Sequence, residues 1–524
     1  MSRRAGGALF PSLEAVAPGS TPLYLQIYQR IRKAILAGNL GPGARLPSTR
    51  TLAADLGVSR ITTELAYAQL DSEGFLVRRV GAGTFVGQFQ PAGRLHPRPA
   101  VAAARPGAAG NPTPGGIAGQ GRVRGREEAA PARAEPRCLS RRGQTIAGAG
   151  ACVEPIAVQA FNAGLPALEA FPVQTWNRLL ARRCRLSGAQ LLGYGEPAGF
   201  RPLREAVAEY LAAARGVACN PEQVIILTSS QQALDLAARL LLDPGDAAWL
   251  EEPGYPGARA ALLAAGGRIV PVPVDERGLD VEAGRALAPA ARLAYVTPSH
   301  QYPTGATMSL ERRLALVRWA ESAGAWVLED DYDSEFRYSG RPLAALQGLD
   351  SSRRVIYIGT FSKVMFPSLR LAYLVTPDDL VDAFVAAVSL TVGHAPQLAQ
   401  AVLADFLAQG QFSAHLRKMR ALYGERRELF LRAAAAELGG RLRLGPSDAG
   451  LQVAAYLADG GADGEGDDRA VAQRGARHGL SLVPLSRYYL GDRARPGLLL
   501  GYAGLAPAAA RQGLRRLARV VGAG

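Results

Sequence analysis

Cysteine and histidine are both scarce in this chain of 524 residues, which contains 4 cysteines and 5 histidines. The cysteines form no CxxC pair and the histidines no spaced cluster, so neither a disulfide framework nor a zinc site is expected. No apolar run approaches the roughly 20 residues that cross a bilayer. The first residues, MSRRAGGALFPSLEA, lack the hydrophobic segment of a signal peptide. We therefore expect no metal, no membrane contact and a cytoplasmic location.

Hydrophobic residues make up 48% of the chain and charged residues 20%, a composition typical of globular domains. At roughly 150 residues per domain, the length suggests about three units. The net charge of +15 is uneven, with an excess of +5 in residues 1–90, +7 in residues 91–150 and only +3 in the remainder. A basic N-terminal part indicates a polyanionic partner, although solubility or a genome rich in arginine codons would give the same bias.

The segment Pro22 to Val86 has the pattern of a compact helical unit. A first helix is predicted in YLQIYQRIRKAIL, where apolar side chains recur every three or four positions. Ser48 is a suitable N-cap for a second helix, TRTLAADLG, which Gly57 ends. Ser59 caps a third helix, SRITTELAYAQLDSEG. The apolar residues of this third helix that we expect to face the core are Ile61, Leu65 and Ala68.

Two short strands are predicted in FLVRRVGAGTFV, on either side of a glycine-rich turn. They follow the second and third helices, which form a helix-turn-helix candidate, in the place of a wing. A helix with a polar, basic first turn can enter the major groove of DNA, where arginine and threonine reach base edges and helix N-termini bind phosphates. A helical bundle with solvated charges would explain each feature alone, but not all of them together.

This segment resembles the winged helix-turn-helix of the GntR regulators, on the basis of LPSTRTLAADLGVSRITTELAYAQLDSEG and GAGTFV. The resemblance implies contacts with double-stranded DNA, at phosphates or at bases. The residues that it implicates are Ser48, Arg50, Ser59, Arg60, Thr62, Thr63 and, at the tip of the wing, Gly83. Ile61 stands where a polar residue is often found, which leaves the base preference open.

Residues 89–152 contain mainly proline, glycine, alanine and arginine, with almost no large apolar side chain. We expect a flexible linker there, which as a coil would span about 40 Å. Its arginines either attract phosphate nonspecifically or serve only as a solubilising spacer. The predicted organisation is thus a winged helix-turn-helix over residues 20–88, a linker over 89–152 and a large domain over 153–524.

In the large domain, helical stretches alternate with short apolar strands such as VIILTS, RLAYVT, AWVLEDD and RVIYIGTFS. This alternation predicts an α/β domain with a largely parallel sheet. Ligands of such folds bind beyond the carboxyl ends of the strands. The residues predicted to lie there are Ser229, Ser230, Tyr255, Ser299 to Tyr302, Asp330 to Tyr332, Ser362 and Lys363.

These residue types suit an aldehyde cofactor with a pyridine ring. Lys363 can form a Schiff base, and Asp330 can keep a pyridine nitrogen protonated so that the ring accepts electrons. Ser230 and Gln231 begin a helix whose free N–H groups favour a phosphate, to which Arg370 adds a bidentate cation.

Two tyrosines complete the set. Tyr255 can stack on a flat ring, and Tyr332, two residues beyond Asp330, can donate a hydrogen bond to a phenolic oxygen. Each residue alone has an ordinary explanation, such as a helix cap or a solvated loop. The ordered series from Ser230 to Arg370, with SHQYPTG and SK between them, is much more specific.

This series resembles the fold type I aminotransferases, which bind pyridoxal 5'-phosphate, from about residue 160 onward. The resemblance implies that Lys363 carries the internal aldimine and that Asp330 pairs with the ring nitrogen. It also implies that Tyr332 bonds the ring hydroxyl and that Tyr255 stacks on the ring. The phosphate contacts that it implies are Ser230, Gln231, Thr360, Ser362 and Arg370. Tyr194 of LGYGEPAG is expected to reach the phosphate of a partner subunit, which implies a homodimer.

Two positions depart from that family. Tyr302 stands where an asparagine before PTG often holds the ring hydroxyl, so Tyr332 is left to act alone. Leu499 in GLLLGYAGL stands where an arginine often binds the substrate carboxylate, so the usual clamp for an amino acid is missing. Arg487 and Arg259 are the candidates for a replacement cation.

The whole chain resembles the MocR-type regulators, in which a GntR winged helix-turn-helix precedes an aminotransferase-like domain. The resemblance implies that an amine or amino-acid effector, or pyridoxal phosphate itself, acts at Lys363 and changes how a dimer engages two DNA half-sites. The alternative is a working aminotransferase with a DNA-binding appendage, against which the missing clamp counts. A DNA-binding scaffold with an inactive cofactor fold is disfavoured because the residues that contact the cofactor are intact.

Overall fold

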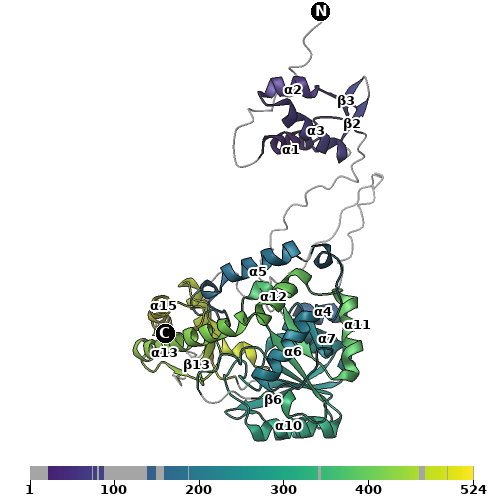
Figure 1. Ribbon diagram of the computed structural model, residues 1–524. Helices are drawn as coiled ribbons and strands as arrows, with labels where there is room; N and C mark the ends of the chain where they lie inside the picture. Colours follow the sequence, from purple (N-terminus) through teal and green to yellow (C-terminus); the bar gives the residue numbers. More distant parts are fainter. Residues whose placement is uncertain are drawn as a thin grey trace, which may run out of the picture. The chain divides into compact units, whose positions relative to one another are not determined.

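The computed structural model of the chain describes residues 22–73, 75–79, 82–87, 139–148, 159–186, 188–339, 344–458, 467–491 and 494–522 (Figure 1). These residues fall into two compact units, which divide between Ala129 and Ala130. Among them, no helix is both long and apolar enough to cross a membrane. Of the range predicted to be a linker, residues 89–138 and 149–152 lie outside the described parts.

The N-terminal unit combines helices with a small antiparallel sheet of strand order β1-β3-β2. Its elements are α1 (Leu23–Leu36), β1 (Arg45–Leu46), α2 (Thr49–Leu56), α3 (Arg60–Ser72), β2 (Leu76–Arg79) and β3 (Gly83–Val86). The side chains of Ser48 and Ser59 cap α2 and α3 as predicted, and Gly57 makes the turn between them with a φ of 64°. The strands β2 and β3 pair as the predicted wing, and β1, which was not predicted, pairs with β3.

The buried face of α3 is opposite to the predicted one. Ile61 is 68% and Leu65 51% exposed, and Ala68 is exposed as well. The side chains that face the core are Thr63, Ala66, Tyr67 and Leu70. Burial of the large side chains of Tyr67 and Leu70 against α1 and α2 decides how the helix is rotated, and it leaves the smaller apolar stripe in solvent.

Helix α4 (Arg141–Gly148) lies within the range predicted to be a linker. It packs against α8 of the large unit, where the Arg142 guanidinium donates to the carbonyl of Ala264 at 2.6 Å. Ser140 accepts a hydrogen bond from the N–H of Gly143 at 3.0 Å and so supports the first turn. None of the residues of α4 is buried. The linker prediction is therefore wrong for this segment, which forms a helix that buries no side chain and is held by a hydrogen bond to the backbone of α8.

The large unit is built on a sheet with the strand order β4-β11-β10-β9-β8-β5-β6-β7. Its strands are β4 (Val224–Leu227), β5 (Ala247–Glu252), β6 (Arg268–Asp275), β7 (Gly278–Leu279), β8 (Leu293–Val296), β9 (Trp326–Asp331), β10 (Val355–Thr360) and β11 (Ala372–Val375). The strands pair in parallel from β10 to β6, while β11 and β7 are antiparallel to their neighbours. The predicted α/β domain with a largely parallel sheet is confirmed.

Helices cover both faces of this sheet, as expected for strands buried on both sides. The helices α7, α8 and α11 contribute to one hydrophobic cluster with the sheet, and α9 and α10 to another. The helices of the unit before α13 are α4, α5 (Val173–Leu186), α6 (Arg201–Arg215), α7 (Ser230–Leu241), α8 (Pro256–Ala265), α9 (Val281–Leu287), α10 (Leu310–Ala323), α11 (Val381–Thr391) and α12 (Gln397–Ala408). The short 3-10 helices are η1 (Leu168–Ala170), η2 (Gly188–Leu191), η3 (Gln347–Leu349), η4 (Pro367–Leu369), η5 (Asp378–Leu380) and η6 (Leu485–Tyr488).

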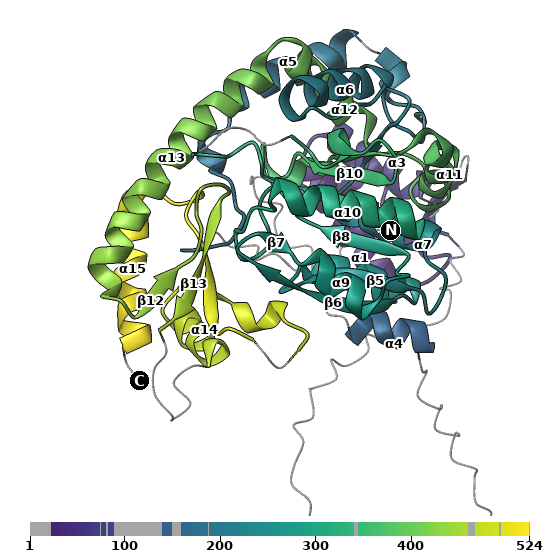
Figure 2. The same cartoon turned by 90° about the horizontal axis from the view of Figure 1, so that it is seen from below.

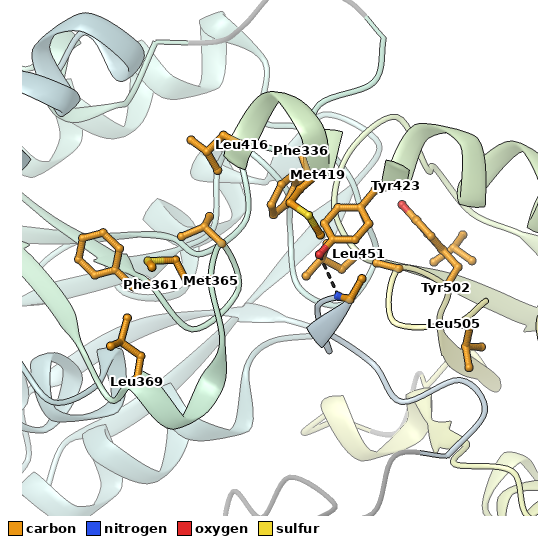
Figure 3. Packing of buried hydrophobic residues seen from close by; sticks show 14 of the residues in the cluster. Phe336, Phe361, Met365, Leu369, Leu416, Met419, Tyr423, Leu451, Tyr502 and Leu505 are labelled. Carbon is orange, nitrogen blue, oxygen red and sulfur yellow. Dashed lines mark hydrogen bonds between the residues drawn. The ribbon is translucent and has the colours of Figure 1, made fainter. Parts of the chain in front are cut away.

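A second, antiparallel sheet of order β12-β13-β15-β14 closes the C-terminal part. Its elements and their helices are α13 (Gln411–Leu438), β12 (Leu442–Leu444), β13 (Gln452–Leu457), α14 (Asp468–Arg477), β14 (Val483–Pro484), β15 (Gly497–Gly501) and α15 (Pro507–Gly522). Figure 2 shows α13 and α15 side by side along this sheet. The large hydrophobic core joins both parts of the unit (Figure 3), and the hydroxyl of Tyr423 on α13 accepts a hydrogen bond from the N–H of Ala167 at 3.0 Å.

Candidate functional site

The carboxyl ends of β4, β5, β8, β9 and β10 meet at one edge of the main sheet, because these strands run in the same direction. A cavity of about 510 Å³ lies there, a volume in the usual range of cofactor sites. Nine of the ten residues predicted to contact the cofactor line it, namely Ser230, Gln231, Tyr255, Asp330, Tyr332, Thr360, Ser362, Lys363 and Arg370.

Lys363 lies in a turn after β10, and side chains on both sides of it in the sequence are buried in the core. Those side chains are Phe361, Val364, Met365 and Leu369, of which Figure 3 labels Phe361, Met365 and Leu369. The N–H of Ser362 donates to the hydroxyl of Thr360 at 3.2 Å, which holds the start of the turn. Gly164 faces the lysine with a φ of +68°, and a Cβ there would lie 2.9 Å from Nζ. The positive φ favours glycine at this position, and the missing Cβ leaves room for the end of the lysine side chain.

Asp330 ends in the cavity and is 5% exposed. One carboxylate oxygen, Oδ2, accepts a hydrogen bond from the hydroxyl of Tyr295 at 2.9 Å, while Oδ1 is buried without a partner. Burial raises the pKa of this carboxyl to about 7. A protonated ring nitrogen would give Oδ1 a donor and would return the carboxylate to its ionised form, so the residue fits a pyridine cofactor.

The N-terminus of α7 forms the part of the cavity that suits a phosphate. Ser229 caps the helix by accepting from the N–H of Gln232 at 3.1 Å, and Ser230 is the first helical residue. Unpaired N–H groups of a first turn bind anions. Gln231 is held by a bond of 2.8 Å from its Nε2 to the carbonyl of Gly257. Arg370 lines the same cavity, so a cation lies with these donors.

The hydroxyl of Tyr332 contacts His300, which falls in the range predicted to lie at the strand ends but was assigned no role there. Nδ1 of His300 lies 3.0 Å from this hydroxyl and 2.9 Å from Oδ1 of Asp333. Burial raises the pKa of Tyr332 well above its ordinary value, which keeps the phenol protonated and able to donate. His300 belongs to SHQYPTG, so the motif carried a signal for it, whereas Tyr295 lies in an ordinary buried strand and carried none.

Three tyrosines in contact with one another line the same cavity. The ring of Tyr302 meets those of Tyr255 and Tyr488 edge-on, with centroids 5.6 Å and 5.3 Å apart, and its hydroxyl lies 3.0 Å from that of Tyr488. Gln452 at the start of β13 also lines the cavity. It is 3% exposed, and its Oε1 is buried without a hydrogen-bond partner. A buried acceptor without a donor indicates a place for a ligand.

The three remaining candidates, and the position of the missing clamp, differ in their placement. Arg487 lines the cavity, but Arg259 is not among the residues around it. Leu499 is completely buried in β15, in a cluster with Ala454, Leu485 and Tyr488. Tyr194 lies outside the cavity of its own subunit and is fully exposed. Its predicted role requires a second chain.

The DNA-binding candidates lie on and beside α2 and α3. Arg50 and Arg60 are exposed, and Nε of Arg60 lies 2.9 Å from Oε1 of Glu64. Gly83 has a φ of +113°, and a Cβ there would lie 3.2 Å from Nε of Arg45. Exposed arginines therefore lie on α2, on α3 and on β1, the strand that pairs with β3 of the wing.

The hydroxyls of this region already serve the helix starts. Ser48 accepts from the N–H of Thr51 and Ser59 from that of Thr62. Thr63 is fully buried, and its hydroxyl lies 2.9 Å from the carbonyls of Thr49 and Arg60. The prediction that Thr63 contacts DNA is therefore wrong, because the side chain pins α3 to α2 inside the unit.

Residues 23–86 match the bacterial regulatory proteins of the gntR family, and residues 160–468 match the class I and II aminotransferases. The chain is 42% identical to the probable rhizopine catabolism regulatory protein MocR of Rhizobium meliloti, over 95% of this chain and 93% of that protein. It is 35% identical to the HTH-type transcriptional regulator TauR of Rhodobacter capsulatus, over 97% and 98%. Among solved structures, LysN, the alpha-aminoadipate aminotransferase of Thermus thermophilus, is similar with a TM-score of 0.64 and 32% identity, over 70% of this chain and 92% of LysN.

Proposed function

Because the chain belongs to the MocR-type regulators of the GntR family, with pyridoxal 5'-phosphate as the cofactor of its aminotransferase-like domain, we propose that Lys363 is the point at which it senses its signal. An amine or amino-acid effector reacts there, and the reaction changes how the winged helix-turn-helix binds double-stranded operator DNA. The observation that supports this proposal is the meeting of Lys363, Asp330 and the first turn of α7 at one cavity.

Each residue of the cavity has a distinct task in this proposal. The cofactor supplies an aldehyde that condenses with primary amines and a ring that accepts electrons. Lys363 offers the resident amine, and Asp330 holds a proton on the ring nitrogen through its free Oδ1. The first turn of α7 and Arg370 bind the phosphate, Tyr255 stacks on the ring and Tyr332 donates to the ring hydroxyl.

The effector occupies the side of the cavity formed by the C-terminal part. Gln452 offers a buried carbonyl oxygen, and Arg487 offers a cation for a carboxylate. An effector shifts the regulator between two states only by its difference in affinity for them. Pyridoxal phosphate itself serves as the signal in a variant of this proposal, in which occupancy of Lys363 alone changes DNA binding.

The regulator acts as a homodimer in this proposal. Tyr194 is fully exposed in the described residues, and an aromatic side chain of that kind is suited to complete the site of a partner subunit. Two tethered winged modules then bind two half-sites at once, and their effective concentration sets the affinity. We expect this DNA-binding regulator to work in the cytoplasm.

The attachment point can be tested directly, because lysine occurs only at positions 33, 363 and 418. We expect borohydride reduction and peptide mass spectrometry to place the cofactor on Lys363. The purified protein is expected to be yellow, with a visible absorption that Lys363→Ala abolishes and that the matched surface variant Lys418→Ala keeps. A wild type that stays colourless with added cofactor, or an adduct found only on Lys33 or Lys418, contradicts the proposal.

The second candidate function is a working aminotransferase with a DNA-binding appendage. The presence of Lys363 and Tyr332 in one cavity favours it, since such a lysine can also move protons. The apolar burial of Leu499 opposes it, because no cation stands at that position. Multiple turnover of an amino acid with a keto acid, without binding upstream of its own or neighbouring genes, would identify an enzyme. Operator binding without turnover would identify a regulator.

A further inference from the structure

The exposed face of α3 carries an apolar pair. Ile61 is 68% and Leu65 51% exposed, and they lie four residues apart, hence on the same side of the helix. In the described part of the N-terminal unit, Val77 on β2 is the one other exposed large hydrophobic residue. A single exposed apolar side chain is ordinary. Two neighbours on the first turns of a helix whose other face is packed indicate a surface that a partner covers.

The surroundings of this pair favour DNA as the partner. Arg60 precedes Ile61 and is held along the helix by Glu64, and the exposed Arg50 lies on the preceding helix. Exposed arginines on these two helices suit contacts with DNA phosphates. Two apolar side chains also provide far less area than the roughly 1,200 Å² of a stable protein interface. The floor of the DNA major groove, where thymine methyl groups lie among polar base edges, fits a pair of this size better.

We propose that Ile61, supported by Leu65, contacts the C5-methyl group of a thymine in the major groove and so selects thymine at one position of each half-site. The inference rests on the proposed function, since α3 must enter DNA. In the major groove only thymine presents a methyl group. Isoleucine cannot pair with the amino group of a cytosine at the same position, and covering that donor without a hydrogen bond is unfavourable. Ile61 therefore reads a base by shape, at a place where a polar side chain would read it by hydrogen bonds.

The experiment uses the full-length protein loaded with pyridoxal phosphate. A preferred duplex is selected from a random pool, and each thymine in it is replaced in turn by deoxyuracil, which lacks only the methyl group. For the wild type we expect one position in each half-site at which this replacement weakens binding about fourfold, the effect of one buried methyl group. Ile61→Ala is expected to bind both duplexes equally, and Ile61→Val to keep a preference for thymine.

A matched control comes from the large unit. Leu310 begins α10 and is 61% exposed, so Leu310→Ala removes a similarly exposed apolar side chain from the start of another helix. This variant is expected to keep the wild-type preference. Because Ile61 is exposed, Ile61→Ala is expected to fold, which its circular dichroism spectrum will show.

The outcomes separate this inference from the proposed function. Selective binding in which no thymine methyl matters, or in which Ile61→Ala keeps the preference, overturns the inference and leaves the regulator intact. An Ile61→Ala variant with unchanged selectivity but a changed sedimentation coefficient also overturns it, since protein then covers the pair. Failure of the wild type to select any sequence overturns the proposed function instead.

Discussion

Asp330→Asn is expected to stabilise the cofactor-free protein, and to do so more strongly as the pH rises. Burial raises the pKa of this carboxyl from an ordinary value of 3.8 to about 7. A carboxyl with a raised pKa imposes no cost below its unfolded pKa, because both states are protonated there. The cost grows as the pH rises and is complete above the folded pKa. Asparagine carries no charge and therefore avoids it.

The magnitude follows from the two pKa values. At about 1.4 kcal/mol per pKa unit, ionising buried Asp330 costs about 4 kcal/mol above pH 7, of which about 2 kcal/mol develop between pH 5.5 and pH 8.5. The amide group that replaces Oδ1 adds a penalty of its own, but one that is the same at every pH. The change in the stability difference with pH is therefore the informative quantity.

Urea unfolding followed by tryptophan fluorescence measures this difference in the large unit alone. The four tryptophans, Trp176, Trp249, Trp319 and Trp326, all belong to that unit. The exposed Asp243→Asn controls for the change of a carboxylate to an amide. Saturation with the cofactor should reverse the order of stability, because the ring nitrogen then pairs with the carboxylate. A difference that is constant from pH 5.5 to 8.5, or that favours the wild type at high pH, refutes the reasoning.

Three further changes test other parts of the account. Arg60→Ala is expected to weaken operator binding about tenfold without changing the visible spectrum. Loss of both operator binding and the visible absorption would contradict the division of these tasks between two separate units. Thr63→Val removes a buried hydroxyl that donates to two backbone carbonyls. We expect the free energy of unfolding of the N-terminal unit to fall by about 1 kcal/mol. Unchanged hydrogen-exchange protection of α3 would contradict this expectation. Gly164→Ala places a methyl group 2.9 Å from Nζ of Lys363 at a φ of +68°, so we expect reduced cofactor occupancy with an intact fold, and full occupancy at stoichiometric cofactor would refute this.

The main sheet and the lining of its cavity could be read from the sequence because both depend on local patterns. Runs such as VIIL and VIYIGT become strands that are buried along their whole length. Parallel strands bring their carboxyl ends together, so residues as far apart as Ser230 and Lys363 could be assigned to one site before any contact was known.

The missed features depend on contacts that local patterns do not contain. The third helix has apolar residues on two sides, and only packing of Tyr67 and Leu70 on other helices decides which side is buried. Helix α4 buries no side chain and is held by a hydrogen bond to a backbone carbonyl. Gln452 follows no motif and reaches the cavity because β13 begins there.

The most direct test of the central claim measures operator affinity with and without pyridoxal phosphate, for the wild type and for Lys363→Ala. If Lys363 links the cofactor site to DNA binding, saturating cofactor or effector will change the wild-type dissociation constant at least fivefold. The same additions will leave Lys363→Ala unchanged. Equal affinities for the wild type under all conditions, or an equal response of the variant, would contradict the claim.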